Sequence, residues 1–315
     1  MKKILFPLLF MLGFLSVSCV NQKRKTGKSL LDSLDSLIIS EHKAKRFDGT
    51  LVIGTKDSII YEKAIGIADR VWDIPMQMNH RFDICSINKS FIAALMLMAA
   101  EEGKLSLNDN LLDHLGPYTY SGKFNPSITI HQMLTHTSGL PDYGQVQSKL
   151  YDNLGRLFKR KHFSTEEYVD FISNVPAIGN PGKQFYYSNF SYHLLGIVLE
   201  KLYKKPFAVL LDQKICQPLL LKNTFSTSSS QTVFKKMVEG YNYEEKTNTW
   251  NRNQFIDFTI GQRIFSTARE LYIWGREMSY PSLLSTKSIE LMQTNHLENS
   301  MNDISYGYGW ALFDG

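Results

Sequence analysis

Residues 84–107 read ICSINKSFIAALMLMAAEEGKLSL, which places Ser86 and Lys89 directly before an apolar run. The run FIAALMLMAA has no polar side, so the helix that it predicts is buried on all faces. Gly103 is typical of the residue that closes such a helix. Burial of a lysine costs free energy, so Lys89 is expected to have a hydrogen-bonding partner or a catalytic role. The stretch therefore predicts the centre of the fold and a candidate site.

Ser86 and Lys89 form the pattern S-x-x-K, which brings both side chains onto one face of a helix. A serine hydroxyl is a weak nucleophile until a neighbouring base takes its proton. Burial and the positive end of the helix dipole both lower the pKa of a lysine, so that its amine can serve as this base. The free N–H groups of the first turn could also bind an oxyanion.

The pattern alone is weak, because it also occurs at Ser40 and Lys43, in a polar segment with no apolar helix behind it. A simpler alternative for the first pair also exists. Ser86 would cap a helix, and Lys89 would extend to solvent. Only the surrounding sequence distinguishes the two readings.

A second motif, Y-x-N, is formed by Tyr187 and Asn189, directly before the apolar run at 190–203. A phenol beside a cation such as Lys89 has its pKa lowered, so Tyr187 could act as a base and return a proton to the leaving group. Asn189 offers an amide to the substrate backbone. The alternative is a tyrosine that only hydrogen-bonds in a core. A second Y-x-N, at 151–153, lacks a following helix.

The first 18 residues carry two lysines and then an apolar run too short for a mature membrane span. This pattern predicts a secretory signal peptide at 1–18. The segment Leu15–Cys19 resembles the lipobox of bacterial lipoproteins, which predicts lipidation of Cys19. The chain would then be exported to the bacterial cell envelope and anchored to the membrane by lipid, facing the periplasm. Plain secretion is the alternative.

The formal net charge of +5 includes six cations within residues 1–28, and without them the charge of residues 29–315 is −1. No basic surface for nucleic acid is expected. Cys85 and Cys216 lie far apart in sequence, so we predict no disulfide framework and treat both as small buried hydrophobes. The histidines have no metal-ligand spacing, so neither a metal nor another cofactor is predicted.

The remaining patterns predict a mixed architecture. Residues 30–39 have apolar side chains at helical spacing, and the β-rich runs at 50–54 and 58–67 predict a hairpin. The signals from 86 to about 240 are mostly helical, with a capping box formed by Ser164 and Glu167. Another capping box, Thr267 with Glu270, starts a later helix.

Four stretches in this order resemble the serine β-lactamase and penicillin-recognising superfamily, in its class C and esterase-like branch. They are SINKSF with EEGKLSLND, ITIHQMLTHTSGLPDY at 128–143, FYYSNFSYHLLGIVLE at 185–200 and ICQPLLLKNTFSTS at 215–228. The resemblance runs from about residue 47 to 315. It implies an α+β fold of the β-lactamase/transpeptidase type, with an antiparallel sheet flanked by helices, a mainly helical subdomain and the site between them.

The resemblance also implies roles for individual residues. Ser86 would be the nucleophile and its N–H one oxyanion donor, Lys89 its basic partner, Tyr187 the general base and acid, and Asn189 the substrate-binding amide. His136, in the family landmark HTSGL, is interpreted as structural. Substrates would be small molecules or peptides with amide, ester or β-lactam bonds. The implied organisation is a signal peptide (1–18), a lipidated tether with the start of the first helix (19–40) and a hydrolase domain (41–315).

One family element is not found in its place. A third motif, K-T/S-G or H-x-G, belongs on a strand after Y-x-N, where it supplies the second oxyanion N–H. Residues 25–27 and 114–116 match it in letters but precede Y-x-N, and Y-G-x-G-W at 306–310 resembles the segment that leads into it. The domain is therefore expected to be incomplete at its C-terminus, as a fragment, a truncated gene product or a shortened inactive relative. Loss of one oxyanion donor lowers rates by about 10²- to 10³-fold.

Two function classes follow from the sequence. The first is a serine hydrolase that forms an acyl-enzyme on Ser86. The second is a noncatalytic envelope protein that keeps the fold and binds peptidoglycan fragments or a protein partner. The sequence selects neither the substrate nor the oligomeric state.

Overall fold

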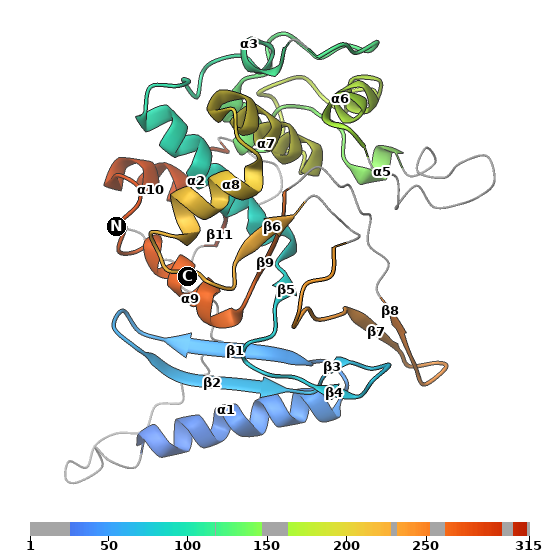
Figure 1. Cartoon of the computed structure of the whole chain (residues 1–315), viewed down its shortest axis with the longest axis vertical. Coiled ribbons are helices and arrows are strands. Elements are labelled where there is room, and N and C mark those ends of the chain that lie inside the picture. The colour runs from blue at the N-terminus through green and yellow to red at the C-terminus, as the bar shows by residue number, and fades with distance from the viewer. Residues whose placement is uncertain are drawn as a thin grey trace, which may run out of the picture. The chain divides into compact units, whose positions relative to one another are not determined.

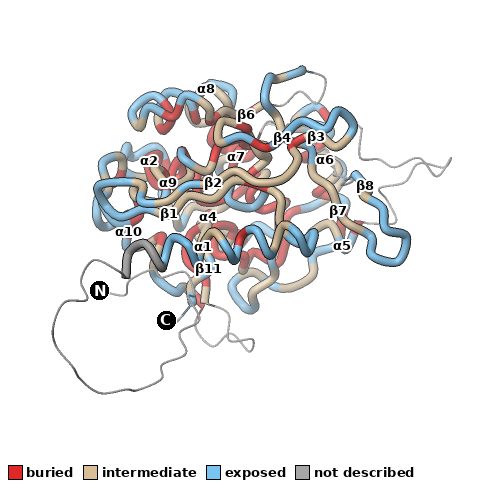
Figure 2. The backbone as a smooth tube through the Cα atoms, turned by 90° about the horizontal axis from the view of Figure 1, so that it is seen from below, coloured by how far each residue is buried: buried red, intermediate tan, exposed pale blue. Residues whose placement is uncertain are grey.

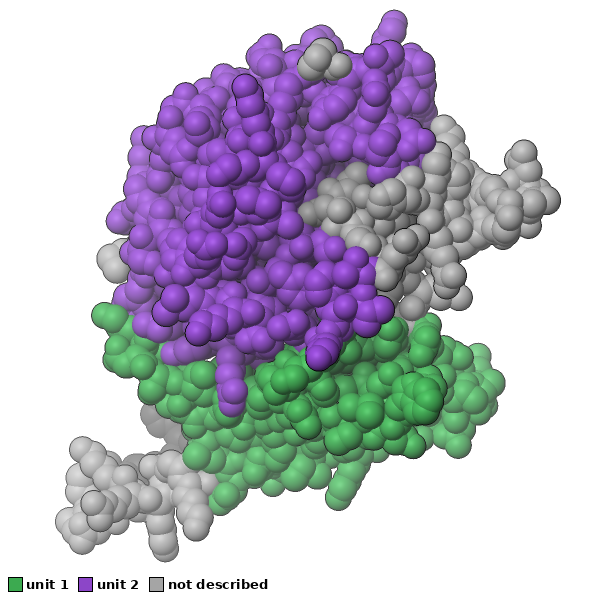
Figure 3. Space-filling model, viewed as in Figure 1, with its two compact units in different colours: residues 1–80, 236–253, 313–315 green, residues 81–235, 254–312 purple. Residues whose placement is uncertain are grey.

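The computed structural model describes residues 26–116, 118–146, 163–227, 232–252, 262–297 and 305–313 (Figure 1). The chain divides into two compact units, each described by itself below (Figure 3). The first comprises residues 1–80, 236–253 and 313–315, and the second comprises residues 81–235 and 254–312. The predicted signal peptide and Cys19 lie outside the described residues, and the predicted domain boundaries remain predictions.

The first unit is built on a helix and a hairpin, as the sequence predicts. The predicted helix is α1 (Thr26–Lys43), which packs on the antiparallel hairpin of β1 (Gly49–Gly54) and β2 (Ile59–Ile65). Asp35 of α1 accepts hydrogen bonds at 2.6 Å from Tyr61 and from Lys63, which fixes the helix on the hairpin. Two further antiparallel pairs are β3 (Ile67–Asp69) with β4 (Ile74–Pro75) and β7 (Tyr241–Glu244) with β8 (Thr249–Arg252).

The second unit contains most of the helices and a three-stranded antiparallel sheet. In this sheet β9 (Arg263–Ser266) lies between β5 (Phe82–Asp83) and β6 (Phe225–Thr227). The helices that concern the site are α2 (Asn88–Glu101), α4 (Ile130–Leu134), α5 (Tyr143–Val146), α7 (Asn189–Tyr203) and α9 (Ala268–Glu277). The other elements are α3 (Leu111–Leu115), α6 (Thr165–Ser173), α8 (Phe207–Leu211), the π-turn Asp212–Cys216, α10 (Thr286–Gln293), β10 (Ser305–Tyr306) and β11 (Ala311–Leu312).

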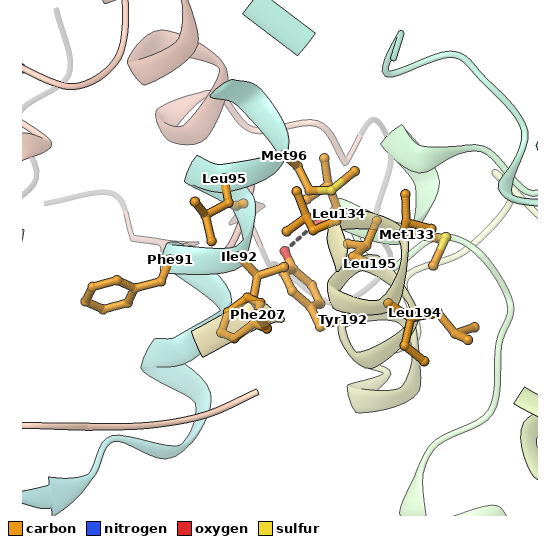
Figure 4. Close-up of a cluster of buried hydrophobic side chains, with 14 of the residues drawn as sticks. Phe91, Ile92, Leu95, Met96, Met133, Leu134, Tyr192, Leu194, Leu195 and Phe207 are labelled. Atoms are coloured by element: carbon orange, nitrogen blue, oxygen red, sulfur yellow. Dashed lines mark hydrogen bonds between the residues drawn. The ribbon is translucent and has the colours of Figure 1, made fainter. Parts of the chain in front are cut away.

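The core of this unit is the contact between α2 and α7 (Figure 4). Every residue of α2 from Lys89 to Ala99 is buried, as the apolar run predicts, and Figure 2 colours buried residues red. Phe91 stacks on Trp274 of α9 with ring centroids 4.2 Å apart, and the indole N–H of Trp274 donates to Ser90 Oγ at 2.9 Å. Trp274 therefore holds the first turn of α2 through two contacts.

The predicted helix ends are confirmed with one difference. Gly103 closes α2 at a positive φ of 68°, and the capping box of Ser164 and Glu167 starts α6. Thr267 caps α9, but the buried carboxylate of Glu270 turns away to accept hydrogen bonds from Asn223 and Thr224. The predicted α+β class is thus observed, with all described strand pairs antiparallel.

Candidate active site

The turn that carries Ser86 is held by a carboxylate and contains a strained residue. Cys85 has a φ of 46°, which is uncommon for a residue with a side chain and costs about 1–3 kcal/mol. Asp83 offsets this cost, because its Oδ1 accepts the N–H of Cys85 at 3.0 Å while its Oδ2 pairs with Arg263 at 2.9 Å. The thiol of Cys85 is exposed, so the prediction that both cysteines are buried is wrong for Cys85 and confirmed for Cys216.

Ser86 lies on a 3-10 turn (Cys85–Ile87) just ahead of α2, and Lys89 lies in the first turn of α2 itself. Lys89 is only 3% exposed, and its Nζ lies 3.4 Å from Ser86 Oγ. The alternative in which Ser86 caps the helix and Lys89 reaches solvent is therefore wrong, since the N-cap of α2 is Ile87. In the second S-x-x-K, by contrast, Ser40 and Lys43 are exposed on α1.

Burial lowers the pKa of Lys89 from its ordinary 10.5 to about 8, and the negative charge of Asp142 partly opposes this shift. A group with a pKa of about 8 is a free amine in an appreciable fraction of molecules near neutral pH. The predicted lowering of the lysine pKa is confirmed, and its main cause is loss of water around the ammonium form.

Tyr187 completes the contacts of the serine, because its hydroxyl donates to Ser86 Oγ at 2.7 Å. Its pKa is raised above 10, chiefly by burial, and only partly lowered again by the hydrogen bond to Ser86. The prediction that the charge of Lys89 lowers this pKa is therefore wrong. Lys89 Nζ faces the ring of Tyr187, 4.9 Å from its centroid, and the main cause of the raised pKa is burial of the phenol. The phenol therefore holds its proton and can donate it to Ser86, and the predicted role of Tyr187 as general base stays a prediction.

Asn189 begins α7 and faces Lys89. Its Oδ1 accepts a hydrogen bond from Lys89 Nζ at 2.7 Å, and its Nδ2 donates to both carboxylate oxygens of Asp142, at 3.0 and 3.2 Å. Both ends of the amide are thus engaged within the protein, so the predicted contact with substrate stays a prediction. Sequence reasoning missed Asp142, although the residue stands in the quoted stretch HTSGLPDY as its only carboxylate.

His136 fixes the backbone on both sides of Tyr187. Its carbonyl oxygen accepts the N–H of Tyr186 at 2.8 Å, and its Nδ1 accepts the N–H of Ser188 at 3.1 Å. Because Nδ1 is an acceptor, Nε2 carries the proton and donates to the hydroxyl of Tyr306 at 3.2 Å. The imidazole is fully buried and stays neutral, since burial holds its pKa well below the ordinary value. The interpretation of His136 as structural is confirmed in this form.

The family model described as Beta-lactamase matches residues 34–315 of this chain. The chain belongs to the β-lactamase family. The matched range contains every residue of the site described above, so the resemblance predicted from the sequence motifs is confirmed.

Three known proteins illustrate how this β-lactamase-family chain relates to others. It is 25% identical over 304 residues to penicillin-binding protein 4* of Bacillus subtilis (strain 168), covering 92% of this chain and 63% of the relative. It is 29% identical over 203 residues to esterase EstB of Burkholderia gladioli, covering 62% of this chain and 51% of EstB. The structure of a penicillin-binding protein from Bacillus halodurans matches with a TM-score of 0.71 and 26% identity, covering 86% of this chain and 81% of that one.

These matches settle the fold as the β-lactamase/transpeptidase type. The chain spans only about half to two thirds of the length of the curated relatives it matches.

Of the two sequences that match the third motif in letters, the one at 114–116 begins in α3, where His114 pairs with Asp109 at 2.7 Å. The other runs into the start of α1, and its Lys25 lies outside the described residues. In the described ranges no group of three or more His, Cys, Asp or Glu residues could hold a metal ion.

Gly309, in the Y-G-x-G-W turn, packs against the head of α2. A Cβ at this position would lie 2.7 Å from the carbonyl oxygen of Lys89 and 2.8 Å from Ser90 Cα, and φ is 75°. Gly309→Ala is therefore expected to destabilise the protein by about 1–3 kcal/mol beyond the cost of the positive φ alone. It should also slow the reaction of Ser86, because the displaced backbone is that of Lys89.

Gly103→Ala is the matched control, because Gly103 has a similar φ of 68° and no atom within 4 Å of the added Cβ. Urea unfolding of the two variants measures the difference. Equal losses of unfolding free energy in Gly309→Ala and Gly103→Ala would show that close packing of the turn against α2 does not contribute.

Proposed function

We propose that this protein is a serine hydrolase that forms an acyl-enzyme on Ser86. The observation that carries the proposal is the pair of contacts of Ser86 Oγ: Tyr187 donates to it at 2.7 Å, and the amine of Lys89 lies 3.4 Å away. A hydroxyl between a proton donor and a buried amine of lowered pKa is an activated nucleophile. Family membership supports the same reading.

The proposed reaction moves its protons through these three side chains. Ser86 Oγ bonds to the substrate carbonyl carbon while its proton passes to Lys89 Nζ. The bond from carbon to the leaving group then breaks, and Tyr187 supplies the proton that the leaving group needs. The phenol regains a proton from the Lys89 ammonium, and water later attacks the acyl carbon by the reverse sequence. The N–H of Ser86, for which the described residues provide no partner, is a candidate donor to the oxyanion.

The substrate class of the proposal is a carbonyl compound with an amide, ester or β-lactam bond. Two observations support this range. One relative is a penicillin-binding protein and another an esterase. In addition, a phenol such as that of Tyr187 can protonate an amine or an alkoxide alike, so this proton donor does not restrict the leaving group.

We further propose that the protein is exported and anchored in the cell envelope through lipid on Cys19. The support is sequence alone: the signal-like residues 1–18 and the lipobox-like segment that follows. In the part of the chain that is described, no helix has the length and hydropathy of a membrane span. Growth with a labelled fatty acid should label the full chain and not its Cys19→Ala variant. Equal labelling of both would overturn the anchor.

Steady-state hydrolysis of an aryl ester, a D-amino-acid anilide and a penicillin tests the proposed activity. Ser86→Ala is expected to lose turnover of every substrate that the wild type hydrolyses. Ser40→Ala is the matched control, since Ser40 stands in the second S-x-x-K and is exposed. Turnover that survives in Ser86→Ala, or a folded wild type with no turnover at all, would contradict the proposal and favour a noncatalytic binding role.

A further inference from the structure

We propose that Asp142 is a positioning residue of this site, which aims the amine of Lys89 at Ser86 by fixing the side chain of Asn189. The inference rests on the proposed function of Ser86 and Lys89. The four side chains form one hydrogen-bonded series that runs from the Asp142 carboxylate through the Asn189 amide and the Lys89 amine to the Ser86 hydroxyl.

The carboxylate decides which way the amide of Asn189 points. An ionised carboxylate only accepts hydrogen bonds, so the Nδ2 of Asn189 must face it. Asp142 Oδ1 also accepts the backbone N–H of Asn189 at 2.9 Å, which holds the first residue of α7 and its side chain together. The amide oxygen is left facing Lys89, and it accepts from Nζ at 2.7 Å. Without Asp142 the amide would be free to rotate by half a turn.

This orientation matters because a neutral amine has one lone pair. When one N–H of Lys89 donates to Asn189 Oδ1, the lone pair is free to face Ser86 Oγ. A reversed amide would present its NH₂ to Lys89 instead. The lone pair of Lys89 Nζ would then accept a hydrogen bond from this NH₂ and would not face Ser86 Oγ. Asp142 therefore determines whether the amine can accept the proton of Ser86.

Asp142 also acts on Lys89 through its charge. The negative carboxylate raises the pKa of Lys89 and so opposes the effect of burial. The other titratable groups that influence Lys89, or that feel its charge, come from several elements. They are Cys85, Tyr187, Tyr192 and the buried neutral His136 and His193. Asp142 is the one carboxylate of the described residues whose charge raises the pKa of Lys89 here, so its removal should shift the titration of Lys89 downward.

The test compares Asp142→Asn and Asp142→Glu in the full chain. In Asp142→Asn the maximal rate of Ser86 acylation by an activated ester should fall about 10- to 10²-fold, because the lone pair is misplaced. The midpoint of the pH–rate profile should also move down by about one pH unit, because the anion is gone. Asp142→Glu keeps the charge and should keep the midpoint. Asp57→Asn, at an exposed loop position, is the matched control.

A second readout does not depend on activity. The pKa of the Lys89 amine, followed by nitrogen NMR of lysine-labelled protein, should fall in Asp142→Asn and stay near the wild-type value in Asp142→Glu. An unchanged pKa in folded Asp142→Asn would overturn the inference. If no variant or wild-type chain is acylated while the NMR shift appears, the proposed hydrolase function fails and the positioning of Lys89 by Asp142 stands.

Discussion

Lys89→Met is expected to slow acylation of Ser86 by about 10²- to 10⁴-fold, because the methionine cannot accept the serine proton. The same variant should lose no stability at pH 7. Burial of the amine depresses its pKa from 10.5 to about 8, which costs the folded protein about 3 kcal/mol. Methionine removes this cost, although it leaves Asn189 Oδ1 without its donor at a loss of about 1–3 kcal/mol. The unfolding free energy should therefore stay equal or rise by up to about 2 kcal/mol.

The pH dependence of this effect has a definite sign. Between about pH 8 and 10.5 the unfolded chain holds a proton on Lys89 that the folded chain has lost, so wild-type stability rises with pH in this window. The cost of the buried ammonium is fully present below pH 8 and has disappeared above 10.5. The unfolding free energy of Lys89→Met should not show this rise with pH.

Urea unfolding across pH and single-turnover acylation measure both effects. Lys43→Met is the control, because Lys43 is the exposed lysine of the second S-x-x-K. It should change neither quantity. A Lys89→Met protein that acylates at the wild-type rate would contradict the role of the amine. A marked loss of stability would instead point to a structural role for the lysine.

Tyr187→Phe is expected to slow acylation by about 10²-fold while leaving stability within about 0.5 kcal/mol of the wild type. The phenylalanine keeps the ring that lies 4.3 Å from His136, and loses only the hydroxyl that donates to Ser86. The midpoint of the pH–rate profile should stay near 8, because the titrating base is Lys89. Tyr186→Phe removes a neighbouring hydroxyl that does not touch Ser86 and serves as the control.

The pH–rate profile of Tyr187→Phe distinguishes two mechanisms. If the phenolate were the base, as the sequence interpretation held, the variant would lose the rise in rate with pH. A profile that keeps its midpoint with a lower maximum supports the amine as base and the phenol as donor. Loss of the rise would contradict this assignment.

The parts of the site that the sequence predicts are those with a local cause. The apolar run after Lys89 predicts a helix buried on all faces, and hence a lysine of lowered pKa. The hairpin at β1 and β2 follows likewise from short-range patterning. The pairing of Ser86 with Tyr187 crosses 101 positions of the chain, and only the family resemblance could suggest it.

The parts that the sequence does not predict depend on tertiary neighbours. The pKa of Tyr187 rises chiefly because the phenol is buried, and the extent of this burial is not encoded in Y-x-N. The direction of the Asn189 amide depends on Asp142, which lies 47 positions earlier in the chain. Glu270 does not complete its predicted capping box, because its carboxylate accepts hydrogen bonds from Asn223 and from the buried Thr224.

The most direct test of Ser86 as the nucleophile is intact-mass spectrometry with peptide mapping, after the folded chain is exposed to a penicillin and to an activated ester. We expect an acyl mass on the peptide that carries Ser86 in the wild type, slower labelling in Lys89→Met, and no labelling in Ser86→Ala. An adduct that maps to another residue, or that persists in Ser86→Ala, would contradict Ser86 as the nucleophile.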